Sequence, residues 1–409
     1  MASPLLPVSE ALTRLLEPVR AVADTESVPL DEAAGRILAV DLVAKLTQPP
    51  FHASAMDGYA LRAADAPDLG AELTVVGQAA AGHAFNGQVG PGECVRIFTG
   101  APLPEGADSI LIQEDAERLS ESRIRTKFPV TVGRHIRPRG QDFAEGETVL
   151  RAGVRLDYAH LTVAAAMNHP QVEVLRRPRV AVLATGDELV HPGSSLQPSQ
   201  IIASNTFGIS ALIRANGGEV IDLGIIPDRQ DLIENAIAKA VAEKVDVLVT
   251  LGGASVGDHD LVQASLKAQG MSLDFWRIAM RPGKPLMVGS LGDMRVLGLP
   301  GNPVASLVCG TLFLEPVVAK LSGTRPKARM AEALAGKPLA ANDQRQDYLR
   351  ARLCRDADGR LIAEPFDKQD SSMMKIFAHS DCLIVRPPHA PELAALTPCP
   401  ILLLRDFDR

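Results

Sequence analysis

Apolar and polar positions follow two different patterns along the chain, and the change between them predicts its organisation. Between residues 179 and 321, short uninterrupted apolar runs alternate with stretches whose apolar residues recur at helical spacing. The expected strands are 180–184, 220–225, 245–250, 273–280, 286–288 and 295–299, and the expected helices are 205–215, 229–241, 260–268 and 303–321. Strands that are apolar throughout, separated by amphipathic helices, predict a parallel sheet covered by helices on both faces.

The two flanking regions have a different pattern. On the N-terminal side, helical spacing predicts helices at 8–20, 30–38 and 156–167, and short β-type runs at 73–76, 94–98 and 109–112 lie between Gly and Pro turns. On the C-terminal side, short strands are expected at 348–353, 361–363, 382–385 and 401–404. The predicted order is therefore a β-rich module, an α/β domain and a second β-rich module, which suits a chain of 409 residues because single cores stop growing at roughly 250–300 residues.

Composition and charge exclude several classes of function. The 42 Lys and Arg against 49 Asp and Glu give a net charge of −7, which disfavours nucleic acid or an anionic membrane as the main partner. The five cysteines are scattered without a CxxC spacing and the nine histidines without HExxH, so neither a disulfide framework nor a zinc site is expected. No signal peptide and no window of ~18 uninterrupted apolar residues is present, which predicts a soluble, cytoplasmic protein with no membrane contact.

Polar loops rich in Gly and Pro follow five of the expected strands. These loops are 185–188, 226–228, 251–260, 281–285 and 300–303. Because the carboxyl ends of parallel strands meet at one edge of a sheet, where ligands of such folds bind, we expect the five loops to lie together.

Two of these loops contain candidate anion-binding groups. The glycines of the 252–257 loop would let backbone N–H groups approach a phosphate at the start of a helix, although a plain tight turn explains them equally well and no P-loop or GxGxxG is present. Lys284, between Pro282-Gly283 and Pro285, would bind an oxyanion as a point charge, or it is a solvated loop lysine.

Acidic residues occur in the same loops. Glu188, Asp228 and Asp260 each stand near a helix or loop start, where helix capping is the simplest explanation. Together, at neighbouring strand ends beside an oxyanion site, they would instead suit Mg²⁺, which prefers oxygen ligands and bridges to substrate phosphates.

Three motifs gather small and polar residues in the N-terminal half. Asp57 lies in Ser-Ala-Met-Asp-Gly-Tyr-Ala, Thr99 in Phe-Thr-Gly-Ala-Pro and Asp142 after Arg-Pro-Arg-Gly-Gln. An Asx-turn is the simplest account of Asp57, and nothing local brings these residues to the strand-end loops.

These motifs resemble a known family. SAMDGYA at 54–60, FTGAPLPEGAD at 98–108, ATGDEL at 184–189, TLGGASVGDHD at 250–260, RPGKP at 281–285 and LPGNPVAS at 299–306 resemble the MoeA family, the molybdopterin molybdenumtransferases, and are similar to the gephyrin E domain. The motifs occur in order over the first three quarters of the chain, and together they are very specific.

The resemblance implies an elongated, multidomain α/β plus β subunit. Residues 1–176 would form an N-terminal linker region with an inserted β module at about 54–146, residues 177–327 a doubly wound α/β molybdopterin-binding domain, and residues 328–409 a C-terminal β-barrel. The family forms homodimers whose cleft is shared between subunits, so that Asp57, Thr99 and Asp142 would reach the α/β site from the partner chain.

The implied reaction inserts molybdate, a substrate, into adenylylated molybdopterin with release of AMP, assisted by Mg²⁺ or a similar divalent cation. The implied catalytic residues are Asp57, Asp142, Glu188, Asp228 and Asp260, with Glu188 and Asp228 as candidate metal ligands. The pterin phosphate and nucleotide would be bound by Thr99, Thr185, Gly252, Gly253, Ser255, Gly257, Pro300, Gly301, Asn302 and Pro303. Molybdate would be bound by Arg281, Lys284, Arg350 and Ser371.

Some positions depart from the family pattern, and some questions stay open. Many members have a second lysine at Arg281, a serine at Ala305 and an Asn-Gly turn at 378–380. The alternatives are a molybdopterin adenylyltransferase and a non-catalytic molybdopterin-binding scaffold. The sequence does not distinguish metal ligand from base among the carboxylates or molybdate from tungstate, and it does not identify which adenylyltransferase or molybdoenzyme acceptors are partners.

Overall fold

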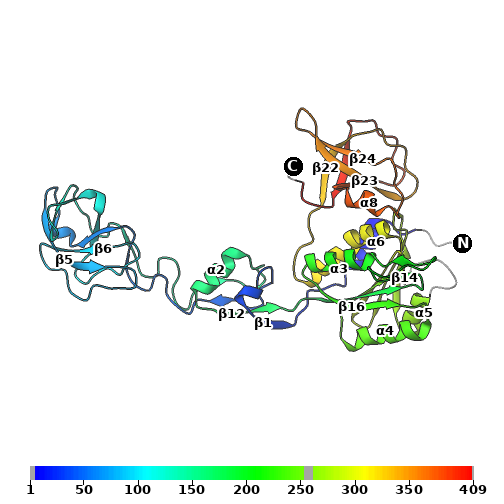
Figure 1. The fold of residues 1–409 in the computed structure, drawn as a ribbon, viewed down its shortest axis with the longest axis horizontal. Helices are drawn as coiled ribbons and strands as arrows, with labels where there is room; N and C mark the ends of the chain where they lie inside the picture. The colour runs from blue at the N-terminus through cyan, green and yellow to red at the C-terminus, as the bar shows by residue number, and fades with distance from the viewer. Residues whose placement is uncertain (1–4, 253–260, 408–409) are drawn as a thin grey trace. The chain divides into compact units, whose positions relative to one another are not determined.

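A computed structural model describes residues 5–252 and 261–407. The chain forms two compact units, one made of residues 1–26 and 175–409 and the other of residues 27–174 (Figure 1). Each unit has its own hydrophobic cores. The two units are described separately below.

A six-stranded sheet organises the α/β part of the first unit. Its order is β16 (Glu219–Ile226), β13 (Arg179–Thr185), β17 (Val247–Leu251), β21 (Met294–Leu299), β20 (Pro285–Leu291) and β18 (Ser272–Arg277). The first four strands are parallel, and β20 runs antiparallel to both of its neighbours. The sheet is therefore mixed rather than wholly parallel, because a two-residue turn, Gly292-Asp293, joins β20 to β21 as a hairpin. Since β18 is antiparallel to β20, it runs in the same direction as the four parallel strands.

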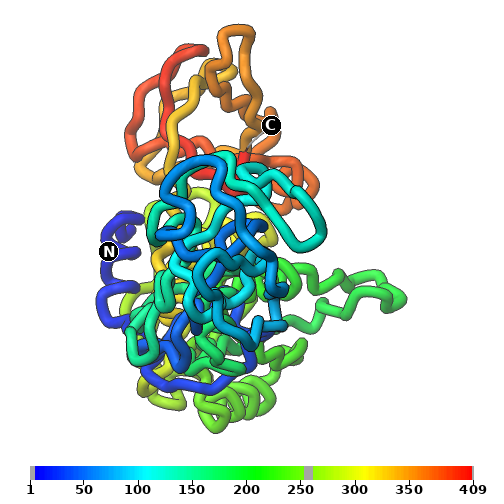
Figure 2. The backbone as a smooth tube through the Cα atoms, turned by 90° about the vertical axis from the view of Figure 1, so that its left-hand side faces the viewer, coloured from blue at the N-terminus to red at the C-terminus, as the bar shows by residue number. Residues whose placement is uncertain are grey.

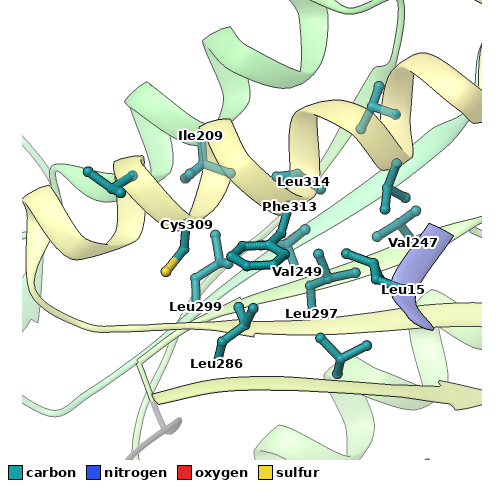
Figure 3. Packing of buried hydrophobic residues seen from close by; sticks show 14 of the residues in the cluster. Leu15, Ile209, Val247, Val249, Leu286, Leu297, Leu299, Cys309, Phe313 and Leu314 are labelled. Atoms are coloured by element: carbon teal, nitrogen blue, oxygen red, sulfur yellow. The ribbon is translucent and has the colours of Figure 1, made fainter. Parts of the chain in front are cut away.

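Helices cover both faces of this sheet, as predicted. One face packs against α1 (Val8–Leu16), α3 (Asn205–Ala215), α6 (Pro303–Cys309) and α7 (Glu315–Leu321), and the other against α4 (Gln230–Ala242) and α5 (Leu261–Ala268). Figure 3 shows Ile209 and Phe313 of the first helical layer against Val249 and Leu297 of the sheet. The short parallel pair β14 (Leu189–Val190) and β15 (Ile201–Ile202) follows β13 in the chain and forms a separate two-stranded sheet.

The predicted helix at 303–321 is present, with a π-helical segment, Gly310–Leu314, at its centre. It is long and apolar enough to cross a membrane, but most of it is buried inside the protein. Its apolar residues Val308, Phe313 and Val317 belong to the core of the α/β part. Its composition is thus that of a core helix.

The C-terminal part is a closed five-stranded barrel, which can be followed from orange to red in Figure 2. Its strands are β22 (Met330–Ala335), β23 (Gln346–Arg355), β24 (Leu361–Pro365), β25 (Cys382–Arg386) and β26 (Pro398–Leu403), with a short helix α8 (Met374–Ala378). The order β23-β24-β22-β26-β25 is closed by pairing of β25 with β23. A two-residue strand from the α/β part, β19 (Met280–Arg281), pairs in parallel with β23 and ties the two parts together.

The second unit contains the β module and a smaller helical part. The module is a six-stranded sheet in the order β7 (Ser109–Ile112), β4 (Gly58–Leu61), β6 (Glu93–Ile97), β5 (Glu72–Ala79), β9 (Arg123–Thr126) and β8 (Ala116–Arg118). The smaller part combines α2 (Tyr158–Ala166) with the strand pairs β1 (Thr25–Pro29)–β12 (Gln171–Leu175) and β2 (Leu42–Val43)–β11 (Thr148–Leu150). Another short pair, β3 (Ala53–Ser54) and β10 (Ile136–Arg137), follows the Pro-rich stretch.

One sequence prediction in this unit is wrong. The helix expected at 30–38 is only a 3₁₀ turn, Leu30–Glu32, between β1 and an extended segment. Gly35 adopts a φ of +75°, and Ile37 and Leu38 instead form isolated bridges to Arg155 and Val174. The apolar spacing there reflects packing of extended chain, because a left-handed residue ends any helical run.

Candidate functional site

Three strand-end loops meet at the carboxyl edge of the central sheet. Leu251 of β17 stands in register with Ala184 of β13 and Leu299 of β21, so the loops that follow begin side by side. Gly252 has a φ of +96°, and a Cβ atom on it would lie 3.0 Å from the carbonyl oxygen of Thr185. The Gly252 Cα lies 3.9 Å from the position of a Cβ on Gly301. The structure thus brings Thr185, Gly252 and Gly301 together. Because the two glycines have no side chains, their backbone atoms can approach one another and Thr185 at this edge.

The loop Pro300–Pro303 is fixed from two sides. Asn205, at the start of α3, donates its side-chain amide to the carbonyl oxygen of Gly301 at 2.8 Å. Asn302 does not cap α6 with its side chain; its Nδ2 donates to Ser371 Oγ at 3.1 Å, and the Val304 N–H donates to the Ser371 carbonyl at 3.0 Å. Ser371, predicted for the site, therefore lies at the start of α6 although it comes from the barrel part.

Carboxylates gather at the ends of β13 and β16. The Asp228 N–H donates to Asp187 Oδ1 at 3.1 Å. A Cβ on Gly186 would lie 2.5 Å from Glu188 Oε2, so the Glu188 side chain folds back over the turn. Desolvation, together with the negative charges of Asp187 and Glu188, raises the pKa of Asp228 above its usual range. The predicted residues Glu188 and Asp228 are thus brought together, with Asp187 as a third carboxylate.

Helix capping does not explain Asp228. The N-cap residue of α4 is Arg229, and no side chain makes a capping hydrogen bond there. Carboxylates held close enough to raise a pKa store repulsion that a cation or a proton would relieve. Among the described residues, no group of three His, Cys, Asp or Glu could hold a metal ion unaided. A cation here would need further ligands, as Mg²⁺ does when it is shared with substrate phosphates.

The Arg281–Pro285 loop carries the predicted cations. Gly283 has a φ of +111°, and a Cβ on it would lie 2.5 Å from Cys309 Sγ, so only glycine lets the loop lie on α6. The Lys284 side chain is exposed. Arg281 forms ion pairs with Asp347 and, at 3.4 Å, with Asp343, both in the barrel part.

The fourth predicted oxyanion-binding residue is Arg350, which is only 2% exposed. Its guanidinium donates to the carbonyl oxygens of Tyr348 and Asp370, each at 3.3 Å. Burial lowers the pKa of Arg350 to about 10, and the charges of Asp370 and Asp347 oppose that shift. Since Asp370 precedes Ser371, Arg350 and Ser371 lie next to each other beside the start of α6.

In the second unit, two predicted residues form a pair. Asp57 Oδ1 accepts hydrogen bonds from the backbone N–H and the hydroxyl of Thr99, each at 2.8 Å. These bonds, first from the Thr99 N–H and then from its hydroxyl, and the nearby Arg96 charge keep the pKa of Asp57 below its usual range. Asp57 is thus not confined to an Asx-turn, since its carboxylate reaches a loop 42 residues away. Asp142 is exposed on the loop after β10, where its N–H donates to the Gln48 carbonyl at 3.0 Å.

Four predicted site residues lie outside the described ranges, and three residues at the site were not predicted. Gly253, Ser255, Gly257 and Asp260 lie outside the described residues. Sequence reasoning missed Asp187, Asn205 and Asp347. Asp187 stands inside the motif ATGDEL and could have been found there, whereas Asn205 and Asp347 act through contacts between distant segments that no local pattern signals.

Comparisons with known proteins agree with this architecture. Three family models match: "MoeA N-terminal region (domain I and II)" at residues 6–168, "Probable molybdopterin binding domain" at 181–320, and "MoeA C-terminal region (domain IV)" at 332–404. The chain is 35% identical to a molybdopterin molybdenumtransferase of Haemophilus influenzae, over 93% of this chain and 94% of the relative. It is 33% identical to the enzyme of that name from Bacillus subtilis, over 93% and 90%.

A solved structure supports the same assignment. The molybdopterin biosynthesis MoeA protein from Pyrococcus horikoshii superposes with a TM-score of 0.83 at 30% identity, covering 99% of this chain and 100% of that one. The matches extend over the α/β part, the barrel and the second unit alike. From its sequence motifs, its fold and these relatives, the chain belongs to the MoeA family.

Proposed function

We propose that this protein inserts molybdate into adenylylated molybdopterin and releases AMP, as a molybdopterin molybdenumtransferase of molybdenum cofactor biosynthesis. The observation that carries the proposal is the meeting of Thr185, Gly252 and Gly301 at one sheet edge. Carboxylates stand at the neighbouring strand ends, and the barrel contributes Ser371 beside the same loops. Such an edge suits a substrate that carries both a phosphoanhydride and a small oxyanion partner.

The glycine and proline loops would bind the pterin nucleotide. Backbone N–H groups of the loop from Gly252 through Gly253, Ser255 and Gly257 would donate to phosphate oxygens, with Thr185 and the segment Pro300–Pro303 closing the other side. The absence of side chains at Gly252 and Gly301 supports this, since both glycines leave backbone accessible where three strands end. The Asn205 and Asn302 hydrogen bonds would hold the second loop rigid.

The carboxylates would serve the phosphoanhydride. Glu188 and Asp228 fit one or two places in the coordination of Mg²⁺, the remainder coming from water and substrate phosphates. Mg²⁺ bound there would neutralise charge that develops on the phosphates. The raised pKa of Asp228 supports a cation at this place, because a cation would relieve the repulsion from Asp187 and Glu188. Asp260, Asp57 and Asp142 would orient water or substrate, with Thr99 holding Asp57.

Molybdate would be bound by Arg281, Lys284, Arg350 and Ser371. Lys284 offers an exposed point charge on the loop between Pro282 and Pro285, whereas Arg350 offers a buried guanidinium that donates to two backbone carbonyls. A desolvated cation interacts with an anion more strongly than a solvated one. Ser371 would add a hydroxyl donor beside them.

A homodimer with a shared cleft would supply Asp57, Thr99 and Asp142 from the partner chain, as the family resemblance implies. The protein would act in the cytoplasm. Mixing Asp57→Ala subunits with Lys284→Ala subunits tests this arrangement. Half of the randomly formed dimers would be mixed, and each mixed dimer would contain one intact site. About a quarter of the wild-type activity should then return, whereas a site built from one chain would give none.

The reaction itself is tested by incubating the purified protein with adenylylated molybdopterin, molybdate and Mg²⁺ and measuring AMP. AMP should appear only when molybdate is present, and Asp228→Asn should abolish it. Substrate that binds without AMP release would refute the proposed reaction and leave the scaffold alternative. ATP-dependent adenylylation of molybdopterin by this protein would instead support the adenylyltransferase alternative, against which the presence of all three MoeA regions stands.

A further inference from the structure

A carboxylate, Asp347, stands among the cations to which we assign molybdate. It is the second residue of β23 and is paired with Arg281 in the register of β19 and β23. Its side chain is 7% exposed and forms an ion pair with Arg281. Its negative charge also acts on Arg345 and on the buried Arg350.

The hydrogen bonding of Asp347 is incomplete. One carboxylate oxygen contacts Arg281, while Oδ1 is buried and accepts no hydrogen bond from any described residue. Burying half of a carboxylate without a donor is costly, so the arrangement is not explained as a simple stabilising ion pair. The Arg281 side chain, by contrast, is 48% exposed and retains room for a second anion.

Asp343 provides an informative contrast. It also pairs with Arg281, at 3.4 Å, but its side chain is 44% exposed and is bound by Arg345 at 2.7 Å. Its charge is therefore screened by water and balanced by a second arginine. Of the two acids on Arg281, only Asp347 is desolvated, so water screens its attraction for the Arg281 guanidinium less than it screens that of Asp343.

We propose that Asp347 is an internal competitor of the oxyanion: it holds Arg281 in the absence of molybdate and thereby sets the affinity of the site. This inference rests on the proposed function, since it takes molybdate as the ion bound by Arg281 and Lys284. Molybdate reaching Arg281 must share or displace this carboxylate. The site then binds molybdate weakly enough to pass it on to the pterin, and Asp347 tunes that affinity without itself contacting the ion.

The test is molybdate binding to the full-length protein by isothermal titration calorimetry, with molybdate alone as the probe. Asp347→Asn keeps the shape of the side chain and removes its charge, and it should tighten molybdate binding on the order of tenfold. The matched control, Asp343→Asn, should change the affinity less than about twofold. A tighter complex is diagnostic because damage to the fold weakens binding.

A double-variant cycle assigns the effect to Arg281. In an Arg281→Gln background, Asp347→Asn should give little or no gain, because the competition acts through the shared guanidinium. Asp347→Glu retains the charge and should bind molybdate as the wild type does, and Asp347→Ser, a second neutral variant that should also tighten binding, keeps the test available if Asp347→Asn misfolds. An unchanged or weaker affinity in a folded Asp347→Asn protein would overturn the proposal, as would an equal gain in the Arg281→Gln background.

Lys284→Ala separates this failure from failure of the proposed function. If Lys284→Ala weakens molybdate binding while Asp347→Asn leaves it unchanged, the molybdate site stands and the role of Asp347 is refuted. If Lys284→Ala binds molybdate like the wild type, the site itself is misplaced, and the proposal for Asp347 is overturned with it.

Discussion

Single residues at the strand ends carry charge repulsion and backbone angles that folding alone does not require. Asp228 is held beside Asp187 and Glu188, and Gly252 and Gly283 adopt backbone angles that other residues rarely take. Such features persist where surrounding structure enforces them, and they concentrate at functional sites. At these positions, substitutions should separate stability from activity.

Asp228→Asn should raise thermal stability slightly while abolishing AMP release. Because the pKa of Asp228 is raised in the folded protein, the folded state disfavours its charged form. The cost is absent at pH values below the unfolded pKa of about 3.9, and it grows as the pH rises through the folded value. The variant should therefore melt up to about 2 °C higher near pH 7, and the gain should vanish near pH 3.

Differential scanning fluorimetry across this pH range measures the effect. The matched control is Asp231→Asn in the first turn of α4, where Asp231 pairs with Arg229 at 2.7 Å. That change should leave the melting temperature the same or lower it. A lower melting temperature for Asp228→Asn at pH 7 would contradict the repulsion argued here.

Gly301→Ala and Gly252→Ala should both abolish AMP release, but only Gly252→Ala should destabilise the fold. Among residues 5–252 and 261–407, a Cβ on Gly301 has no closer neighbour than the Gly252 Cα at 3.9 Å, so we expect the fold to tolerate it, but it would occupy the space assigned to the pterin nucleotide. Gly252→Ala adds strain at a φ of +96° and a contact of 3.0 Å to Thr185, and it should lower the free energy of unfolding by about 1–3 kcal/mol. Normal AMP release by Gly301→Ala would argue against nucleotide binding at this edge.

At the scale of elements, the sequence pattern predicted most of the α/β part and less of the barrel. Helix α3 matches the predicted 205–215, because an apolar helical face and Asn216-Gly217 after it act locally. Strand β22 was missed: Met-Ala-Glu-Ala-Leu-Ala has high helix propensity, yet it is paired on both sides by β24 and β26. Closing the barrel requires that strand, and only the other strands, distant in sequence, supply the reason.

The candidate site divides in the same way. Residues at or just after strand ends, such as Thr185, Gly252 and Gly301, were predicted to meet because parallel strand ends share an edge, and they do. Contacts made between separate parts, such as Asn302 with Ser371 or Arg281 with Asp347, depend on how the barrel docks. Local spacing contains no information about docking.

A buried ion pair fixes the junction between α7 and the barrel. Glu315, 3% exposed, accepts both ends of the Arg329 guanidinium at 2.8 Å, and Arg329 also donates to the carbonyls of Leu403 and Leu404. Arg329→Ala would leave Glu315 buried without its partner and should cost about 3–5 kcal/mol of unfolding free energy. Denaturant unfolding measures this cost.

The exposed pair of Lys337 with Asp367 is the control for this prediction. Lys337→Ala should cost far less unfolding free energy than Arg329→Ala, because water screens the pair. At a permissive temperature, Arg329→Ala protein that remains folded should still release AMP, since Arg329 bonds to Glu315, Leu403 and Leu404 and to no residue of the strand-end loops within the described ranges. Equal costs for the two variants would show that the buried pair does not carry the junction.

At the scale of the whole molecule, the chain leaves the first unit after Glu26 and returns at Leu175, and each buried core cluster of the described residues lies within one unit. The Arg176 N–H donates to the Asp24 carbonyl at 2.8 Å, so the two crossing points lie close together. Replacing residues 27–174 by a Gly-rich linker of about four residues should therefore leave a folded first unit. It should melt cooperatively and bind molybdate through Lys284 and Arg350, yet release no AMP because Asp57, Thr99 and Asp142 are gone.

The control for the excision is full-length Asp57→Ala, which should lose AMP release while keeping the second unit. An unfolded first unit by circular dichroism would show that the second unit supports its fold, and AMP release by the excised protein would remove the second unit from the reaction.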